Sequence, residues 1–491
     1  MKMMSEAKRL HPVAALIHAL RQLKELLIPL LFFVLFGSRG SGNLFYLAAS
    51  AGILIIVVGF GILAWYRFTY RIENRELRIE HGIFVRRKRY IPFERIQSLD
   101  VSEGLLQRPF GLVKIKVETA GGAGSEDAEA VLAAVTKEDA AFIHEMLVSA
   151  KKGRPSAREE AEAEAETILY QITLRELLLL ASTSGGVGVV ISAVFAFVFQ
   201  FEEFIPYETV FKGLEDFASL GLIIITGVIF LGFLLAWVIS VLSTMLKYAN
   251  FTLKKVENDF IITRGLLEKR QFTIPLNRIQ AVRISENPLR QPFGLASVFL
   301  ESAGGSAVNE ESAKVIVLPI IKKGKVPKLL GPYLKECEFE WPLAPAPKRA
   351  FRRYLFRSSI VTLPLAALSI IFFRPWGLIG LLLLAASFLW AWLEFRAAGW
   401  GLHGGYLALR FRTIGKNTVI MKKEKVQSIS VKQSHFQRKK HLATIEAVVK
   451  SGHNGSGGKV ADLECGDMER IYRWYSREQD SAADVELAGG E

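Results

Sequence analysis

One phrase of the sequence occurs twice and contains residue types that can bind phosphate. Residues 107–122 read QRPFGLVKIKVETAGG, and residues 290–305 read RQPFGLASVFLESAGG. Glycine-rich turns can present backbone amides to phosphate oxygens, so the phrase is compatible with a ligand loop. The charged positions differ between the copies, however, whereas Pro, Phe, Gly, Leu and the closing Gly pair are retained. We therefore interpret the phrase as a structural motif whose residues set a turn and fill a core.

Residues capable of catalysis or metal binding do not occur at the spacings that such sites require. The eight His residues are scattered, without an HExxH motif, and the sequence contains neither a GxSxG motif nor a P-loop. The two Cys residues, Cys337 and Cys465, are far apart and imply neither a disulfide framework nor a zinc site. The sequence therefore predicts a protein that is not an enzyme, with no catalytic residue, metal or cofactor.

Clusters of Lys and Arg are the stronger functional signal. The formal net charge is +14, and a basic residue near an anionic bilayer gains roughly 1 kcal/mol. We interpret the clusters as candidates for binding lipid headgroups or a protein partner and expect no nucleic-acid partner. The alternative is a solvated basic surface that membrane topology alone imposes. The candidates are Arg86, Arg87, Lys88, Arg89, Lys254, Lys255, Lys269, Arg270, Lys422, Lys423, Lys425, Arg438, Lys439 and Lys440.

A second short phrase, a basic residue followed by an aliphatic residue and Gln, occurs at 95–97, 278–280 and 425–427. Each Gln precedes apolar residues of an expected strand, where a side-chain amide normally bonds a neighbouring strand or turn. A contact with a ligand or partner is the alternative. This phrase and the Pro-Phe-Gly turn define a repeat motif: Arg95, Gln97, Pro109, Phe110, Gly111, Arg278, Gln280, Pro292, Phe293, Gly294 and Gln427.

Long apolar segments must place these motifs at a membrane. The chain is 51% hydrophobic with a mean hydropathy of +0.27, and a membrane helix needs about 20 apolar residues. Three blocks fit pairs of such helices, at 12–66, 173–247 and 351–396. The first helix of the first block is the weakest, because its apolar stretch at 26–36 is short. Positive charge flanks the open ends of the blocks, so both termini and the intervening regions are expected in the cytoplasm.

The regions that follow the blocks alternate apolar and polar residues, which is the period of half-buried antiparallel strands. Residues 67–152 and 248–336 share one plan, with hairpin turns at His81-Gly82 and Arg264-Gly265, and residues 397–478 are a degenerate third copy. Residues 153–172 and the Pro-rich 337–350 are expected to be linkers, and 479–491 a disordered tail. The expected fold class is three repeats of two transmembrane helices and a small antiparallel β-barrel, capped by a C-terminal helix.

The order of these features resembles a known family. A helical hairpin, short strands, the phrases "IPxxRIQxV" and "QxPFGL", a Gly pair, a strand and a helix are similar to the bacterial pleckstrin-homology-like (bPH2-type) membrane proteins. The three-copy layout is similar to their YdbT-like members. The resemblance covers nearly the whole chain and implies three PH-like domains in a multi-pass protein of the bacterial inner membrane. It supplies no catalytic residues.

Two functional hypotheses follow. The first is a non-enzymatic scaffold that presents three cytoplasmic PH-like domains to a protein partner, to other copies of itself or to anionic membrane lipids. Envelope maintenance or stress and antimicrobial tolerance is a setting consistent with such a protein. The alternative is a transporter or lipid-handling membrane protein, but the expected helices carry almost no charge within the membrane, and transport sites usually need such charge.

Overall fold

The computed structural model describes most of the β-domains and of the apolar helices. These residues form two compact units, Met1–Pro275 and Leu276–Glu491. The first unit contains a complete β-domain, domain 1, and the second contains another, domain 3. The described residues are 6–20, 22–24, 26, 43–119, 130–152, 167–184, 192, 222–303, 314–334, 339, 342–372, 376–451 and 455–476.

Domain 1 consists of two antiparallel sheets and a closing helix. Alternate residues of each strand point inward, as in β2, where Tyr70 and Ile72 are buried between more exposed neighbours. The sheets and the helix share one core that includes Leu77, Ile115 and Ile143. One sheet contains β1 (Lys8–Arg9), β2 (Thr69–Glu73), β3 (Glu76–His81) and β4 (Arg87–Pro92), and β5 (Ile96–Glu103), β6 (Leu112–Thr119), β7 (Ala130–Thr136) and α3 (Lys137–Lys152) follow.

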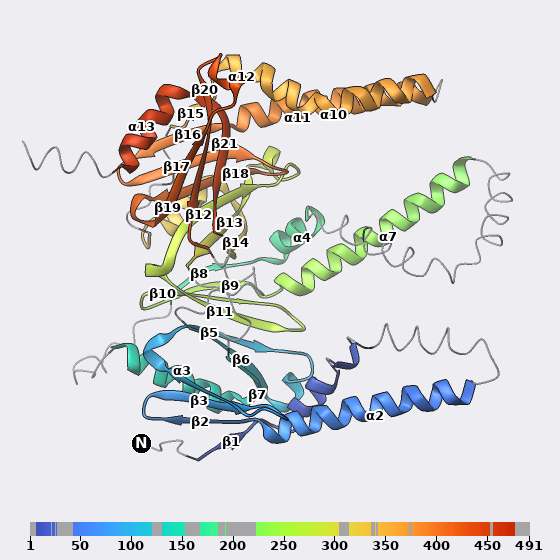
Figure 1. Cartoon of the computed structure of the whole chain (residues 1–491), viewed down its shortest axis with the longest axis vertical. Helices are drawn as coiled ribbons and strands as arrows, with labels where there is room; N and C mark the ends of the chain where they lie inside the picture. Colours follow the sequence, from blue (N-terminus) through green and yellow to red (C-terminus); the bar gives the residue numbers. More distant parts are fainter. Residues whose placement is uncertain are drawn as a thin grey trace, which may run out of the picture. The chain divides into compact units, whose positions relative to one another are not determined.

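The other two repeats follow the same order of strands (Figure 1). Domain 2 has strands β8 (Thr167–Gln171), β9 (Thr252–Val256), β10 (Asp259–Arg264) and β11 (Lys269–Pro275) in the first unit. Its remaining elements, β12 (Ile279–Glu286), β13 (Leu295–Ser302), β14 (Lys314–Lys322) and α9 (Val326–Leu330), lie in the second unit. Domain 3 has β15 (Ala344–Pro345), β16 (Gly399–His403), β17 (Tyr406–Arg412), β18 (Lys416–Lys422), β19 (Val426–Lys432), α12 (His435–Arg438), β20 (Leu442–Val449), β21 (Ser456–Glu464) and α13 (Cys465–Tyr475).

The apolar segments are inserted into their β-domains between the first and second strands. The pairs β1–β2, β8–β9 and β15–β16 are antiparallel neighbours in space, although an apolar segment separates the two strands of each pair in sequence. Two chain connections therefore tie each apolar segment to its own domain. Strand β8 lies within 153–172 and β15 within 337–350, the two segments that sequence analysis assigned to linkers.

Sheets continue from one repeat into the next. Strand β5 of domain 1 pairs with β11 of domain 2, and β12 of domain 2 pairs with β18 of domain 3. Each pairing joins two smaller sheets into one of seven strands, in the orders β7-β6-β5-β11-β10-β9-β8 and β14-β13-β12-β18-β17-β16-β15. Consecutive repeats are thus connected by backbone hydrogen bonds as well as by the chain.

Four described helices are long and apolar enough to span a membrane. The candidate spans are Ala48–Arg67, Phe230–Tyr248, Lys348–Phe372 and Gly380–Ala397. Both helices of a pair are described in the third block, where the Ser358 hydroxyl donates to the Ser387 carbonyl oxygen at 2.8 Å. The predicted first helices of the other two blocks lie mostly outside the described residues. The helices are α2 (Asn43–Arg67), α4 (Leu174–Ser182), α7 (Leu222–Tyr248), α10 (Phe351–Phe372) and α11 (Ile379–Ala397).

The fold class predicted from the sequence is confirmed as apolar membrane helices combined with repeated antiparallel β-domains. Both predicted hairpin turns are also confirmed. Gly82 has a φ of 116° and Gly265 a φ of 105°, in a region that side chains disfavour. A Cβ atom on Gly82 or Gly265 would lie 2.0 Å from a carbonyl oxygen across the turn, so glycine is required at both positions. The predicted Gly-Gly turns lie outside the described residues.

Candidate membrane-facing site

Each repeat carries an exposed apolar turn beside its spanning helix. We call the turn between the third and fourth strands of a repeat its apex: residues 82–86, 265–268 and 413–415. In domain 1, Phe84 is 86% exposed, and its ring centroid lies 6.2 Å from that of Phe60 in α2. The apex of domain 1 therefore lies against a helix that crosses the membrane, which defines the membrane side of this domain.

The apex of domain 2 has the same relation to its helix. The amide of Gly265 donates to the carbonyl oxygen of Ala249 at 2.8 Å, and the amide of Leu266 donates to that of Leu246 at 3.0 Å. These bonds satisfy carbonyl groups at the C-terminal end of α7, which have no partner within the helix. Leu266 and Leu267 remain exposed. The second apex is thus an apolar turn fixed to the end of a spanning helix.

The apex of domain 3 repeats the arrangement with different residues. Ile414 at its tip is 76% exposed. The guanidinium of Arg412 lies 5.9 Å from the centroid of the Trp390 ring in α11, within the range of a cation–π contact. Arg410 donates from Nε to the carbonyl oxygen of Ala397 at 2.8 Å, at the C-terminal end of α11. The first two apices therefore contact a spanning helix directly, and the third domain contacts its helix through β17, the strand that leads into the apex.

The Pro-Phe-Gly turn lies close to the apex of the next repeat. Gly111 and Gly294 have φ values of 65° and 63° and end short 3-10 helices, so the predicted turn is confirmed. The interpretation that Phe fills a core is wrong, because Phe110 is 59% exposed and Phe293 is 72% exposed. Arg108 donates from Nη1 to the carbonyl oxygen of Leu266 at 2.9 Å, which places the first turn beside the second apex. An exposed Phe on the membrane side can enter the bilayer interface, and sequence pattern alone does not distinguish that environment from a core.

A compact basic cluster lies beside the third apex around Glu286. Lys416 Nζ is 3.0 Å and Lys323 Nζ 3.3 Å from the Glu286 carboxylate, and Arg410 and Arg412 lie on the adjoining strand. Burial lowers the pKa of Arg412 and of Lys416, and the negative charge of Glu286 counteracts both shifts. Four cations around one carboxylate leave an excess of positive charge at the membrane side. No contiguous stretch of sequence indicates this cluster, because its members come from three strands and from the short 3-10 helix after β14.

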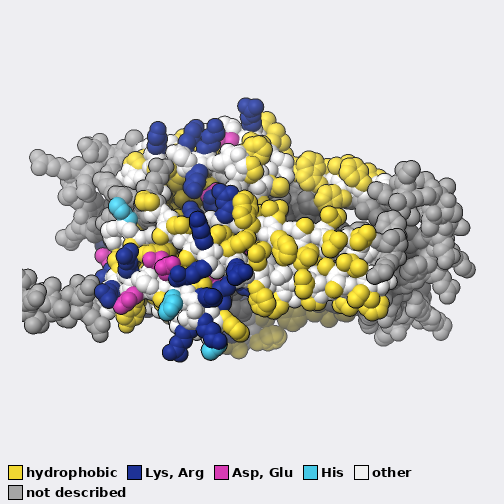
Figure 2. All heavy atoms as spheres, turned by 90° about the horizontal axis from the view of Figure 1, so that it is seen from above, with side chains coloured by type: hydrophobic (Ala, Val, Ile, Leu, Met, Phe, Trp, Pro, Cys, Tyr) yellow, Lys and Arg dark blue, Asp and Glu magenta, His cyan; other side chains and the backbone are white. Residues whose placement is uncertain are grey.

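The basic residues predicted from the sequence divide between the two ends of the domains. Those next to an apex or on the turn after β19 are on the membrane side: Arg86, Arg87, Lys88, Arg89, Lys269, Arg270, Arg438, Lys439 and Lys440. Others lie toward the opposite, distal end: Lys254, Lys255, Lys422, Lys423 and Lys425. Figure 2 shows Lys and Arg side chains gathered next to the hydrophobic surface of the spanning helices. The structure therefore brings together only part of the predicted set.

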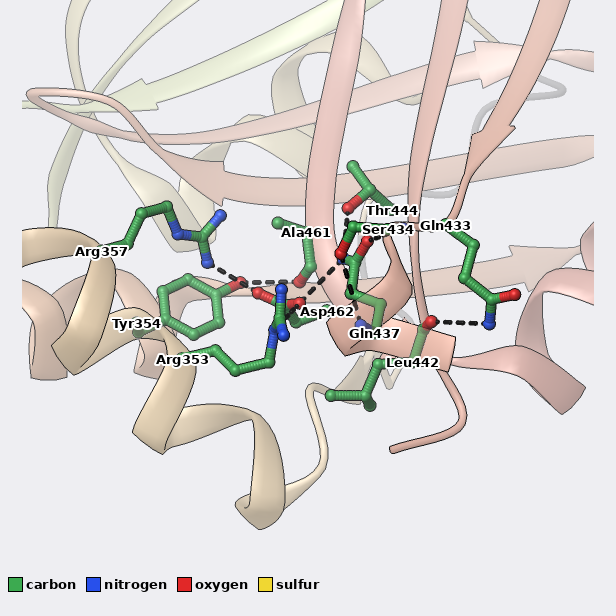
Figure 3. Close-up of polar contacts among 10 residues, drawn as sticks. All are labelled: Arg353, Tyr354, Arg357, Gln433, Ser434, Gln437, Leu442, Thr444, Ala461 and Asp462. Carbon is green, nitrogen blue, oxygen red and sulfur yellow. Dashed lines mark hydrogen bonds and ion pairs between the residues drawn. The ribbon is translucent and has the colours of Figure 1, made fainter. Parts of the chain in front are cut away.

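Domain 3 holds its spanning helix through a buried carboxylate (Figure 3). Arg353 donates from Nε to Asp462 Oδ1 at 2.6 Å, and Arg357 donates from Nη2 to Oδ2 at 2.7 Å. Gln437 donates from Nε2 to the same Oδ1 at 2.8 Å, and the Asp462 side chain is only 1% exposed. The cluster connects the first turns of α10 to β21 and so fixes the helix to the domain.

The same Gln position confirms how the degenerate third repeat aligns with the first. Gln107 accepts from the amide of Gly104 at 2.7 Å, and Gln437 accepts from the amide of Ser434 at 2.9 Å, three residues earlier in both cases. Gln107 then donates to the carbonyl oxygen of Ala133 on β7, whereas Gln437 donates to Asp462 on β21. The first repeat therefore bonds backbone where the third bonds a carboxylate.

The repeated Gln of the base–aliphatic–Gln phrase has a different surrounding in each described copy. Gln280 is buried and donates to the carbonyl oxygen of Arg278 at 3.0 Å, which supports a structural role. It also lines a cavity of about 430 Å³ at the distal end of the β12–β18 junction, together with Lys422 and Lys425. Gln427 is exposed. Among the described residues, no group of His, Cys, Asp or Glu is arranged to hold a metal ion.

Comparisons with known proteins agree with this organisation. A family model described as "Bacterial PH domain" matches residues 26–151, 210–336 and 358–479. The sequence is 41% identical over 495 residues to the UPF0699 transmembrane protein YdbT of Bacillus subtilis (strain 168), and the alignment covers 97% of this chain and 99% of that protein. No solved structure matches the sequence.

Proposed function

Since the chain belongs to the bacterial PH domain family as a three-repeat transmembrane member, we propose that it is a non-enzymatic scaffold of the bacterial inner membrane. Its three PH-like domains rest on the cytoplasmic, anionic surface of the bilayer and are held there for interaction with protein partners. The observation that carries this proposal is the apex. In each repeat an exposed apolar turn lies beside basic side chains, and either the turn itself or the strand that leads into it contacts the spanning helix.

Apolar side chains and basic side chains act on different parts of the membrane. Phe, Leu and Ile at the apices gain free energy by leaving water for the boundary between headgroups and acyl chains. Lys and Arg beside them attract the anionic headgroups, at roughly 1 kcal/mol each near the surface. Phe84, Leu267 and Ile414 therefore act as interfacial anchors. The basic side chains beside the first apex bind headgroups, and we call them the basic collar: Arg86, Arg87, Lys88 and Arg89.

Depth measurements in the bilayer test the anchoring. With the full chain in nanodiscs, spin labels on Phe84→Cys, Leu267→Cys and Ile414→Cys are expected to be more accessible to oxygen than to an aqueous nickel chelate. The matched control is Glu94→Cys, an exposed position in the turn after β4 at the distal end, where the opposite preference is expected. Equal aqueous accessibility at the apices and at position 94 would refute the proposal.

Lipid retention tests the basic collar separately. Replacement of Arg86, Arg87, Lys88 and Arg89 by Ser is expected to reduce the ratio of anionic to zwitterionic lipid that co-purifies with the full chain roughly tenfold. The full additive effect is not expected, because Glu80 forms ion pairs with Arg86 and Lys88. The control replaces the distal Lys254 and Lys255 by Ser, and an equal loss of anionic lipid in this control would contradict binding at the collar.

A further inference from the structure

The sheet order leaves one edge strand in the first repeat and one in the third. The strands at the equivalent positions of the other repeats pair with a strand of a neighbouring repeat. The fourth strand of domain 2, β11, pairs with β5, and the corresponding strand of domain 3, β18, pairs with β12. In domain 1 the corresponding strand is β4, which is the last strand of its sheet among the described residues. In domain 3 the strand that corresponds to β5 and β12 is β19, which is likewise an edge in the described part of its sheet. The edge strand β4 is thus equivalent to β11 and β18, and the edge strand β19 is equivalent to their partners β5 and β12.

Both internal junctions use the same register. Lys269 of β11 lies opposite Glu103 of β5, and Lys416 of β18 lies opposite Glu286 of β12. Glu103 and Glu286 occupy equivalent positions, since each lies seven residues after the Ile that begins its strand, Ile96 in β5 and Ile279 in β12. Lys269 and Lys416, which lie opposite them, are therefore equivalent as well. When the register is transferred to the edge strands, Lys88 lies opposite Val431, Arg89 opposite Ser430, and Tyr90 opposite Ile429.

The membrane anchors of the two strands are compatible with this register. Strand β4 begins next to the apex whose Phe84 contacts α2. Strand β19 ends next to α12, whose Gln437 shares Asp462 with Arg353 of α10. An antiparallel pair with this register places the start of β4 beside the end of β19, and both of these ends are on the membrane side. Two copies inserted in one bilayer with the same orientation therefore present the edges at matching heights.

We propose that copies of this chain associate head to tail in the membrane, with β4 of one copy paired antiparallel to β19 of the next. This contact repeats the hydrogen-bonding pattern of the internal junctions and does not depend on lipid binding by the basic collar. Because the two surfaces differ, the contact is heterologous and produces rings or open rows of copies.

Side chains make this contact weaker than the internal junctions. Gln433 occupies the repeat position of Glu103 and Glu286, so the acid–base pair of the internal junctions is lost. Lys432 lies opposite Arg87 in the transferred register, where both internal junctions have Ser on the β19-type strand. Glu446 pairs with Lys432 at 3.3 Å and reduces this repulsion. The association is therefore expected to be reversible.

Disulfide cross-linking in membranes tests the pairing and its register. In a background with Cys337→Ser and Cys465→Ser, chains carrying Arg89→Cys and differently tagged chains carrying Ser430→Cys are expressed together. Directly opposed residues of an antiparallel pair are close enough for a disulfide. We expect an oxidised mixed dimer several-fold more abundant than with the off-register partner Gln427→Cys, and a ladder of multimers when one chain carries both Arg89→Cys and Ser430→Cys.

A second variant keeps the test independent of any folding defect. Lys432→Ser restores the residue type of the internal junctions at an exposed position, and it is expected to increase the mixed dimer several-fold. The control is Lys450→Ser, outside the edge strand, with no expected change. The proposal is overturned if cross-linking is equal in and out of register, if the doubly substituted chain cross-links only within the monomer band, or if Lys432→Ser leaves the dimer unchanged.

Discussion

Replacement of Glu301 by Gln is expected to destabilise the second unit by about 3–5 kcal/mol, the usual cost of removing one partner of a buried ion pair. Arg283 donates from Nε to Glu301 Oε1 at 2.7 Å, and its Nη2 is 2.6 Å from the same oxygen. The side chains are 9% and 0% exposed. Without the carboxylate, the charge of Arg283 stays buried and is no longer neutralised.

Arg283 also connects two repeats, so the effect extends beyond one strand. Its Nη2 donates to the hydroxyl of Ser456 at 3.0 Å and to the carbonyl oxygen of Gly457 at 2.8 Å, at the start of β21. Burial and the positive charge of Arg283 lower the pKa of Lys314, and Glu301 counteracts them. The Glu301 carboxylate therefore stabilises the charge of Lys314 within domain 2 and the charge of Arg283, which connects domain 2 to domain 3.

The measurement is the thermal denaturation of the purified full chain in detergent, with hydrogen exchange of β12 and β21 as a local readout. Glu469→Gln is the matched control, because Glu469 pairs with Arg473 on the surface, where both side chains are more than 60% exposed. Surface pairs contribute about 0–1 kcal/mol. Arg283→Met combined with Glu301→Leu is expected to be less destabilising than Glu301→Gln, since it leaves no buried charge. A Glu301→Gln chain as stable as the control would contradict this account of the pair.

Replacement of Asp462 by Ala is expected to release α10 from domain 3 and to lower the free energy of unfolding by about 2–4 kcal/mol. The loss is smaller than for Glu301 because Arg353 and Arg357 are 29% and 48% exposed and can regain water. Asp462 also has a φ of 59°, a left-handed conformation that Asp and Asn tolerate better than Ala. The substitution thus removes two ion pairs and adds backbone strain.

Two variants separate charge from backbone conformation. Asp462→Asn retains tolerance of the left-handed conformation and an amide oxygen for Gln437, so it measures the loss of charge. The difference between Asn and Ala measures the loss of the remaining hydrogen bond and the strain. Faster amide exchange at β21 and in the first turns of α10 is expected for both variants. Unchanged exchange in α10 would show that Asp462 does not couple the helix to the domain.

Local patterns were sufficient to predict the long apolar helices and most of the strands, but not β8 and β15, which lie in segments with the composition of linkers. Apolar stretches of membrane length identified α2, α7, α10 and α11, because only a closed helix satisfies backbone hydrogen bonds in lipid. Alternation of apolar and polar residues identified the strands, and Gly82 and Gly265 marked turns that only glycine adopts without strain. These features depend on neighbouring residues, so one sequence contains the necessary information.

Part of the candidate site was not predictable for identifiable reasons. Phe110 and Phe293 were predicted to be core residues, because exposure of a Phe side chain to water is unfavourable. The sequence pattern does not show whether such a side chain leaves water by entering a protein core or by entering lipid. Arg283 has no counterpart in the other repeats, where Asp100 and Ser430 occupy its position, so the repeat pattern gave no indication of the buried pair with Glu301. The apices contain apolar residues where turns are normally polar. This unusual composition was the one feature of the sequence that could have indicated their contact with the membrane.

The sequence by itself determined which segments are apolar enough to enter the membrane, where most of the strands form and how often the unit repeats, since each depends on hydrophobic periodicity along the chain. Tertiary structure alone decided that the spanning helices are inserted between the first and second strands of their domains, and that β5 pairs with β11 and β12 with β18. The physical reason is that strands pair through backbone groups, which are the same for every residue except Pro. The choice of partner strand is therefore made by the packing of the whole chain.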